Sequence, residues 1–376
     1  MGNEIKTKVA IVSMSACEYL PPLISLMNDS RWTQYDVKVF TTRWSKGKYP
    51  PYAGPRTVYR TSTHFPTFWL INLFDQLRFA IYTFLHLLLF RPAVILDIER
   101  GSSVPVLLYL ILFRRTTRLF MHYYEYSTLE ELSRCALPNR LAHRGEVALQ
   151  KRASWISQCN EMRIRAYQND YRLPDGICHV IHNYPPATWQ RHFRLQKTIS
   201  VPVKAVFCGV RMDLETLYVR EFSDYVIRQN GKLVWDIYLA SPSREIEEFI
   251  RSLNSPWVHL YASNIDYSQM PERLAKYNVG VILYKGITLN RKYVECNKFY
   301  EFLSCGLDVW FSSRMEAQHS LVTRDCYPKV VMLDFDHMED VNLEQLISHE
   351  NLQSNMPSYT AEKAADDFFH VLKATI

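Results

Sequence analysis

Two charged residues one helical turn apart lie in the segment Val279–Ser312, where they could bind a nucleotide. An apolar strand opens this segment, a polar loop follows, and a helix carrying Lys298 and Glu301 begins near Asn297. Ligands of open parallel sheets bind where such a loop and helix leave the carboxyl end of a strand. The helix N-terminus and Lys298 would favour a phosphate, and the Glu301 carboxylate could accept both hydroxyls of a ribose. The spacing is equally that of an ordinary surface ion pair, so both interpretations stay open.

A histidine and a glutamate at the end of another predicted strand form a second candidate site. The segment Phe120–Ser127 reads FMHYYEYS, which places His122 and Glu125 where the strand gives way to a loop. Histidine titrates near neutral pH, so a histidine beside a carboxylate is suited to acid–base chemistry. The alternative is that both residues lie at a sheet edge without a chemical role.

Short apolar strands alternate with helical segments along the whole chain, which predicts the elements that position these residues. Strands separated by helices form parallel sheets covered on both faces, and right-handed crossovers make them doubly wound. We therefore predict an α/β protein with two Rossmann-like domains that face a cleft. A proline-rich stretch at 184–202 reads as the linker. The predicted domains are 1–190 and 200–356, followed by a C-terminal helix at 357–376 that could cross back to the first domain.

The composition supports two globular domains and excludes several function classes. The chain has 376 residues, of which 48% are hydrophobic and 22% charged, and a formal net charge of +6. This charge is too modest to indicate a nucleic-acid partner. The eight cysteines include no CxxC pair, so we expect free thiols in a reducing cytoplasm. Asp97 and Asp213 are solitary acidic residues rather than a metal motif, so we expect no catalytic metal and no cofactor.

The segment from Asn297 to Val309, NKFYEFLSCGLDV, resembles the donor-binding signature of the GT-B glycosyltransferases. It resembles especially the group-4-like enzymes of bacterial surface polysaccharide synthesis. The resemblance implies that Glu301 holds the ribose, that the helix start faces phosphate, and that an arginine after the first strand of this domain contacts the diphosphate. The residues it marks as donor-binding are Gly209, Arg211, Tyr284, Asn290, Asn297, Lys298 and Glu301.

The same resemblance extends to the first domain. It implies that residues 1–190 form the acceptor domain and residues 200–356 the nucleotide-sugar donor domain. His122, Glu125 and Tyr126 match a His-x-x-Glu-Tyr pattern. It implies that His122 hydrogen-bonds the transferred sugar and that Glu125 acts as an acid/base or orients the acceptor. Tyr126, and Ser15 and Glu18 after the first strand, are the corresponding acceptor contacts.

The function that this resemblance implies is transfer of a sugar from a nucleotide-sugar, with UDP or GDP expected, to a glycan or lipid-linked glycan. Retention of anomeric configuration and independence of metal are part of the expectation. The alternative is a non-catalytic binding or regulatory subunit, because the family's second glutamate corresponds here to Tyr293. A different α/β enzyme, such as an epimerase or an NAD-linked oxidoreductase, is disfavoured because no G-x-G-x-x-G follows any strand.

The apolar stretch from residue 67 to 90 has two interpretations. It is rich in Phe, Leu and Trp and also carries Arg78. Polar residues interrupt it too often for an easy transmembrane span. It could lie on a membrane surface and bring the site to a lipid-linked acceptor, which would place the protein at the inner face of the membrane. The interpretation that we favour is a pair of core helices.

Overall fold

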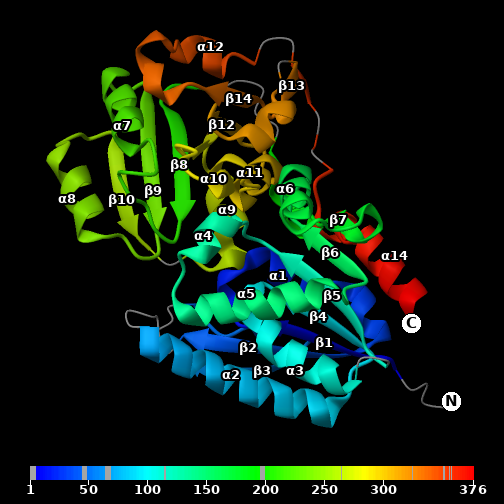
Figure 1. The fold of residues 1–376 in the computed structure, drawn as a ribbon. Helices are drawn as coiled ribbons and strands as arrows, with labels where there is room; N and C mark the ends of the chain where they lie inside the picture. The colour runs from blue at the N-terminus through cyan, green and yellow to red at the C-terminus, as the bar shows by residue number, and fades with distance from the viewer. Residues whose placement is uncertain are drawn as a thin grey trace. The chain divides into compact units, whose positions relative to one another are not determined.

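The computed structural model describes the chain except residues 1–5, 45–48, 64–68, 114–115, 195–199, 264, 324, 350–351, 355 and 357. The chain forms two compact units, one of Met1–His182 with Ala361–Ile376 and the other of Asn183–Thr360. Each unit has its own parallel sheet and its own core (Figure 1).

A seven-stranded sheet in the order β3-β2-β1-β4-β5-β6-β7 forms the centre of the first unit, and all its pairings are parallel. The predicted doubly wound α/β architecture is confirmed, although β3 was not predicted. The strands are β1 Lys8–Ser13, β2 Asp36–Trp44, β3 Thr57–Thr63, β4 Val94–Ile98, β5 Arg118–Tyr123, β6 Trp155–Gln158 and β7 Cys178–Val180.

Helices cover both faces of this sheet because successive residues of each buried strand point to opposite sides. In β1, Val9 and Ile11 pack with α1 (Pro21–Asn28) and α14 (Asp366–Thr375). Ala10 and Val12 pack on the other side. The helices on that side are α2 Trp69–Phe90, α3 Ser103–Phe113, α5 Leu137–Gln150 and α6 Glu161–Tyr171. The short helices α4 Leu129–Ser133 and α13 Ala361–Ala364 complete the unit.

The apolar stretch at 67–90 departs from the prediction of two core helices. Its described part is one helix, α2, of 22 residues. Among the described residues, only this helix is long and apolar enough to cross a membrane by length and composition. Phe79, Leu87 and Phe90 are buried in the core, whereas Leu89 is 82% exposed. One face of α2 therefore belongs to the core and the other does not.

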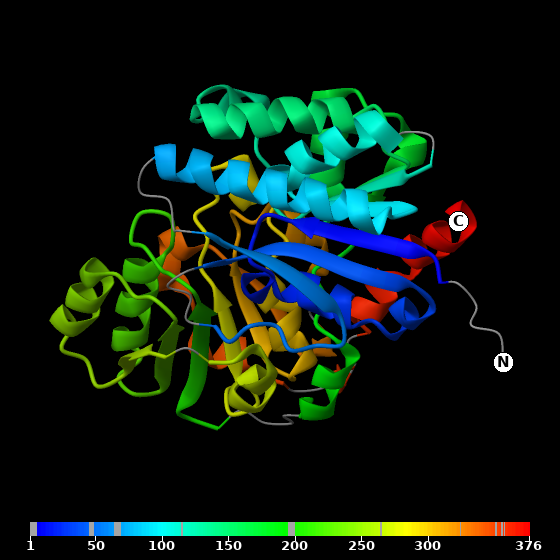
Figure 2. The same ribbon diagram turned by 90° about the horizontal axis from the view of Figure 1, so that it is seen from below.

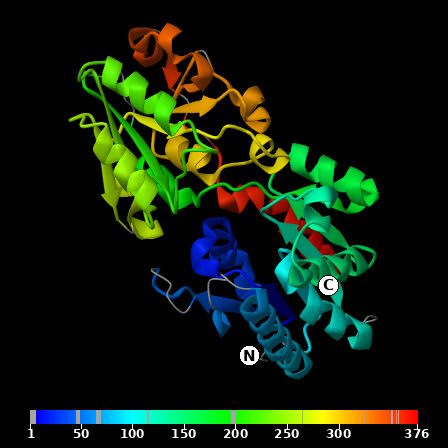
Figure 3. The same cartoon turned by 60° about the vertical axis from the view of Figure 1, so that its left-hand side comes forward.

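A six-stranded parallel sheet forms the second unit, in the order β10-β9-β8-β11-β12-β14. Its strands are β8 Val203–Gly209, β9 Leu233–Leu239, β10 Val258–Ala262, β11 Val279–Ile282, β12 Asp308–Ser312 and β14 Val330–Leu333. One face packs against α7 Val219–Arg228, α8 Arg244–Ser252 and α12 Leu343–Ile347, and the other against α9 Met270–Leu274 and α11 Asn297–Ser304 (Figure 3). Beside them lie α10 Leu289–Lys292 and a small sheet of β13 Cys326–Tyr327 and β15 Gln353–Ser354.

The helix predicted at 213–228 begins six residues late, at Val219. The Asp213 carboxylate accepts hydrogen bonds from the N–H groups of Glu215 and Thr216, which stabilises a turn in place of the first helical turn. Leu217 then forms an antiparallel bridge with Tyr284. The backbone at Leu217 therefore pairs with the segment that follows β11 instead of forming helical hydrogen bonds.

Each sheet has a point where the chain reverses its direction of winding. In the first unit this point lies between β1 and β4, and in the second unit between β8 and β11. Ligands of open α/β sheets bind outside the carboxyl ends of the strands at such points. The loops after these four strands are therefore where functional residues are expected.

Candidate active site

The predicted donor residues gather on the segments that follow β8 and β11. Gly209 ends β8, and the exposed Arg211 follows it. Tyr284 lies two residues after β11, and Asn290 is in α10. Asn297, Lys298 and Glu301 form the first turns of α11. All seven thus follow the carboxyl ends of the two strands at the switch point of the second unit.

Lys298 and Glu301 form a buried ion pair. The Lys298 Nζ lies 2.6 Å from Glu301 Oε2, and the side chains are 21% and 0% exposed. Burial lowers the pKa of Lys298, but the adjacent Glu301 carboxylate more than offsets this, so the pKa lies above its usual value. The alternative of an ordinary surface pair is wrong, because Glu301 is inaccessible. Among the described residues, Glu301 Oε1 has no hydrogen-bond partner.

The helix α11 lies close against the sheet because a glycine in β11 leaves room for it. A Cβ atom on Gly280 would come within 2.0 Å of the ring of the buried Phe302. The predicted left-handed cap at Gly306 is confirmed by its φ of 80°. The N–H of Leu307 donates to the Phe302 carbonyl and the N–H of Gly306 to the Leu303 carbonyl, which is a Schellman motif. These glycines fix where Lys298 and Glu301 lie.

Cationic and aromatic side chains surround the loop after β11. The Arg291 guanidinium lies 4.5 Å from the ring centroid of Tyr284, a cation–π contact. Lys285 Nζ lies 3.0 Å from Glu221 Oε1. The Lys298 and Glu301 charges also act on the Cys208 thiol near the end of β8, whose pKa burial raises to about 12. The loops after the two strands therefore bring ion pairs, an arginine and an aromatic ring together.

His122 lies inside the core of the first unit. His122 is fully buried, and its Nδ1 lies 2.8 Å from Ser157 Oγ. Burial lowers the pKa of His122 to about 3, so the ring is neutral at physiological pH. The ring is therefore closed off from solvent in this conformation, and its contact with a sugar stays a prediction. Glu125 is 66% exposed, and its Oε2 lies 3.8 Å from the Arg163 guanidinium.

The predicted acceptor residues are engaged with other parts of the first unit. Glu18 is nearly buried and lies 2.7 Å from Arg60. The hydroxyl of the buried Tyr126 donates to Asp170 at 2.8 Å. The partly buried Ser15 accepts two hydroxyl hydrogen bonds through its carbonyl oxygen. Glu18 and Tyr126 therefore hold the loop structure, and their contact with an acceptor stays a prediction.

The described residues contain no cluster of three or more His, Cys, Asp or Glu side chains that could hold a metal ion.

Comparisons with known proteins identify the fold. No protein-family model matches the chain, and no curated protein is significantly similar to it in sequence. The solved lipopolysaccharide outer core galactosyltransferase WaaB matches with a TM-score of 0.63 at 11% identity, over 98% of this chain and 100% of WaaB. HepE of Anabaena, solved with UDP and glucose, has the same score, identity and coverage. A putative UDP-N-acetylglucosamine 2-epimerase from Listeria monocytogenes matches with a TM-score of 0.62 at 10% identity, over 98% of this chain and 96% of the epimerase.

The chain has the GT-B fold. At these identities the likeness establishes the fold alone. In this GT-B chain the predicted donor residues all belong to the second unit, and the first unit has a separate set of polar residues at its own switch point.

Glu99, which the sequence analysis did not select, lies at the switch point of the first GT-B unit. It follows β4 directly, with φ 64° and ψ 157°, a region that is essentially restricted to glycine. Its Oε1 accepts hydrogen bonds from the N–H groups of Tyr124 at 2.6 Å and Glu125 at 3.0 Å. Burial, and then the nearby Glu125 carboxylate, raise the pKa of Glu99 to about 7. Its position after an apolar run was the only signal in the sequence.

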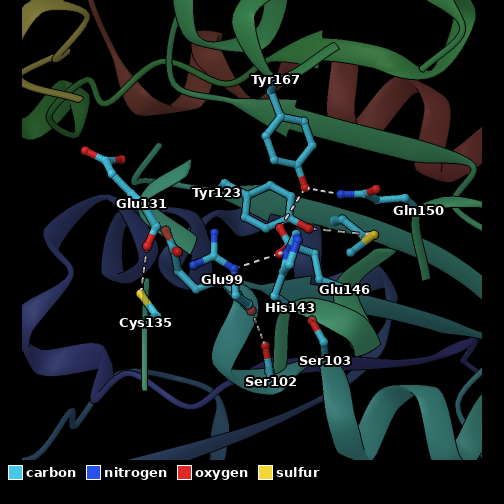
Figure 4. A network of polar contacts seen from close by, with 12 residues as sticks. Glu99, Ser102, Ser103, Tyr123, Glu131, Cys135, His143, Glu146, Gln150 and Tyr167 are labelled. Carbon is cyan, nitrogen blue, oxygen red and sulfur yellow. Dashed lines mark hydrogen bonds and ion pairs between the residues drawn. The ribbon is translucent and has the colours of Figure 1, made fainter. Parts of the chain in front are cut away.

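A buried network centred on Glu146 holds the loop that contains Glu99. Glu146 Oε2 lies 2.7 Å from Arg100 Nε and 3.0 Å from His143 Nδ1, and Oε1 accepts a hydrogen bond from the Tyr167 hydroxyl at 2.8 Å. Figure 4 shows Tyr167 and His143 converging on this carboxylate. Burial alone would raise the pKa of Glu146, but these hydrogen bonds and the Arg100 charge lower it. The network ties the segment after β4 to α5 and α6.

Proposed function

We propose that this protein is a glycosyltransferase that moves a sugar from a nucleotide-sugar to a glycan or lipid-linked glycan. The observation that carries the proposal is the Lys298–Glu301 pair in the first turns of α11, beside the carboxyl ends of β8 and β11. The GT-B fold, shared with a galactosyltransferase and with a protein solved in complex with UDP and glucose, supports it.

The donor nucleotide would bind through charge and through hydroxyl recognition. The N-terminus of α11, the half-buried Lys298 and the exposed Arg211 are suited to a diphosphate, and Gly209 has no side chain to obstruct it. Since Lys298 covers Glu301, we propose that Lys298 turns toward the diphosphate when the donor binds. The Glu301 carboxylate would then be free to accept the ribose hydroxyls. Tyr284, Asn290 and Asn297 are further donor contacts in this proposal.

The transfer forms a bond between the acceptor oxygen and the anomeric carbon, while the bond from that carbon to the diphosphate breaks. The electron pair leaves with the diphosphate, whose charge Lys298, Arg211 and the helix dipole would stabilise. Glu99 is our candidate for the base that takes the acceptor proton, because its pKa of about 7 suits that task. Metal independence, a UDP or GDP donor and a role in surface polysaccharide synthesis belong to the same proposal. So does retention of configuration, which in this single displacement requires the acceptor oxygen to enter on the face that the diphosphate leaves.

The experiment is a turnover assay with a panel of UDP- and GDP-sugars and glycan acceptors, following both nucleoside diphosphate release and the product glycan. We expect one donor to turn over, with kcat/KM strongly reduced in Glu301→Gln. Glu99→Gln is expected to lower kcat by a factor of about 10² or more. Glu316→Gln, a change at a partly exposed surface ion pair, serves as the control. Binding of a nucleotide without turnover of any sugar would favour the non-catalytic subunit instead.

An epimerase is the second candidate, because two solved structures with this fold are named as UDP-N-acetylglucosamine 2-epimerases. The same assay separates the two functions. A transferase links the sugar to the acceptor, whereas an epimerase changes the configuration of the sugar and leaves the acceptor unmodified.

A further inference from the structure

One face of the first unit exposes an apolar stripe along the full length of α2. Leu70, Phe74, Leu77, Ile81, Leu85 and Leu89 recur at intervals of three or four residues and are 41–82% exposed together with Ile71. This spacing places them on one side of a helix. Single exposed apolar residues are common, but a contiguous stripe marks an interaction surface.

The stripe continues onto the two neighbouring helices. Ile111 and Leu112 of α3 are 59% and 62% exposed. Leu137 and Leu141 of α5 are also exposed. Figure 2 shows α2, α3 and α5 side by side as one layer, in agreement with their mutual packing. We call the exposed side chains of these three helices the outer helical face.

The layer is held on the sheet and does not span a membrane. Phe79, Leu87 and Phe90, on the other side of α2, are buried in one core cluster with Ala10 and Phe40 of the sheet. Spanning a bilayer would remove these three side chains from the core that they fill. A helix with one buried and one exposed apolar face, fixed on a folded domain, can instead lie in the plane of an interface.

The accessible charged side chains of these three helices are all cationic. Their described residues include two carboxylates, Asp75 and Glu146, and both are buried and paired with arginines. Arg140 and Arg144 are exposed. They share the helical spacing of Leu137 and Leu141, so α5 presents cations next to apolar side chains.

We propose that the outer helical face docks on the surface of a bilayer that contains anionic phospholipid. Apolar side chains would enter the boundary between headgroups and acyl chains, and the arginines would contact the anionic headgroups. In a symmetric dimer built on this face, the same three helices of the second copy would cover the arginine pair, and they carry no accessible carboxylate that could balance it. The surface belongs to the first unit and the donor residues to the second, so either proposal can fail without the other.

The test is flotation of the purified protein with vesicles of phosphatidylcholine alone or mixed with phosphatidylglycerol. We expect the protein to float only with the mixed vesicles, and less at high salt. Ile81→Asp/Leu85→Asp is expected to abolish flotation. Arg140→Gln/Arg144→Gln is expected to weaken binding roughly 30-fold, since each basic residue contributes about fivefold. The control is Arg244→Gln/Arg251→Gln, which removes two exposed arginines from α8 in the second unit.

Circular dichroism and an unchanged unfolding midpoint would show that each variant is folded, as expected for exposed positions. The proposal is overturned if the wild-type protein remains unbound with both vesicle types. It is also overturned if Arg140→Gln/Arg144→Gln and Arg244→Gln/Arg251→Gln bind equally well to the mixed vesicles. Dimerisation in light scattering that Ile81→Asp/Leu85→Asp abolishes, without flotation of the wild type, would assign the face to a second copy instead.

Discussion

Replacing Lys298 by methionine should cost far more stability than replacing an ordinary surface lysine. The change keeps most of the side-chain volume but leaves the Glu301 carboxylate, which is 0% exposed, without its ammonium partner at 2.6 Å. Breaking one side of a buried ion pair typically costs about 3–5 kcal/mol, because an uncompensated charge stays buried. Lys298 is itself 21% exposed, so we expect the lower part of this range.

The assay is urea unfolding followed by tryptophan fluorescence, with two comparison variants. Lys292→Met breaks a surface pair in which Lys292 Nζ lies 3.3 Å from Glu316 Oε1, and it should cost less than about 1 kcal/mol. Lys298→Met/Glu301→Leu removes both buried charges and should recover most of the loss. Equal costs for Lys298→Met and Lys292→Met, or no recovery in the double variant, would refute the assignment of a buried pair.

Three further changes test the packing and electrostatics around the sites. Gly280→Ala should destabilise the second unit by about 3 kcal/mol, measured by the same unfolding assay, because its Cβ would overlap the buried Phe302 ring. Gly306→Ala should cost about 1–3 kcal/mol in that assay, because its φ of 80° suits glycine and the Cβ would come within 2.5 Å of the Arg194 carbonyl oxygen. Burial raises the pKa of Asp97 to about 8, so the folded protein holds this proton more tightly than the unfolded chain and loses stability as pH rises toward and through 8. Asp97→Asn cannot ionise, so its melting temperature relative to wild type should be higher at pH 9 than at pH 6; an equal difference at both pH values would contradict this.

The architecture was predictable because it depends on local patterns. Apolar runs such as β4, separated by helix-length segments, indicated parallel sheets, and they are parallel. The glycine at position 306 marked the end of α11 because a left-handed residue commonly follows a helix. The late start of α7 was not predicted, because besides the Asp213 turn it depends on pairing between Leu217 and Tyr284, which are 67 positions apart.

The chemistry of individual side chains was less predictable because burial depends on distant segments. His122 looked like a strand-end histidine, but Ser157 of the neighbouring strand and the ring of Tyr124 enclose it. The burial of Glu301 likewise depends on how closely α11 packs on β11. The unusual backbone of Glu99 has no local sequence signal at all, since most residues at its φ would be glycine.

Nucleotide binding to the wild-type protein and to Glu301→Gln tests the central claim most directly. The measurement is the thermal stabilisation produced by UDP, GDP, ADP and CMP, with Glu316→Gln as the matched control. A nucleotide at 100 times its Kd should stabilise the wild type and the control by about 2.7 kcal/mol, and Glu301→Gln much less. No stabilisation by any nucleotide, or equal stabilisation of all three proteins, would contradict a donor site at Lys298 and Glu301.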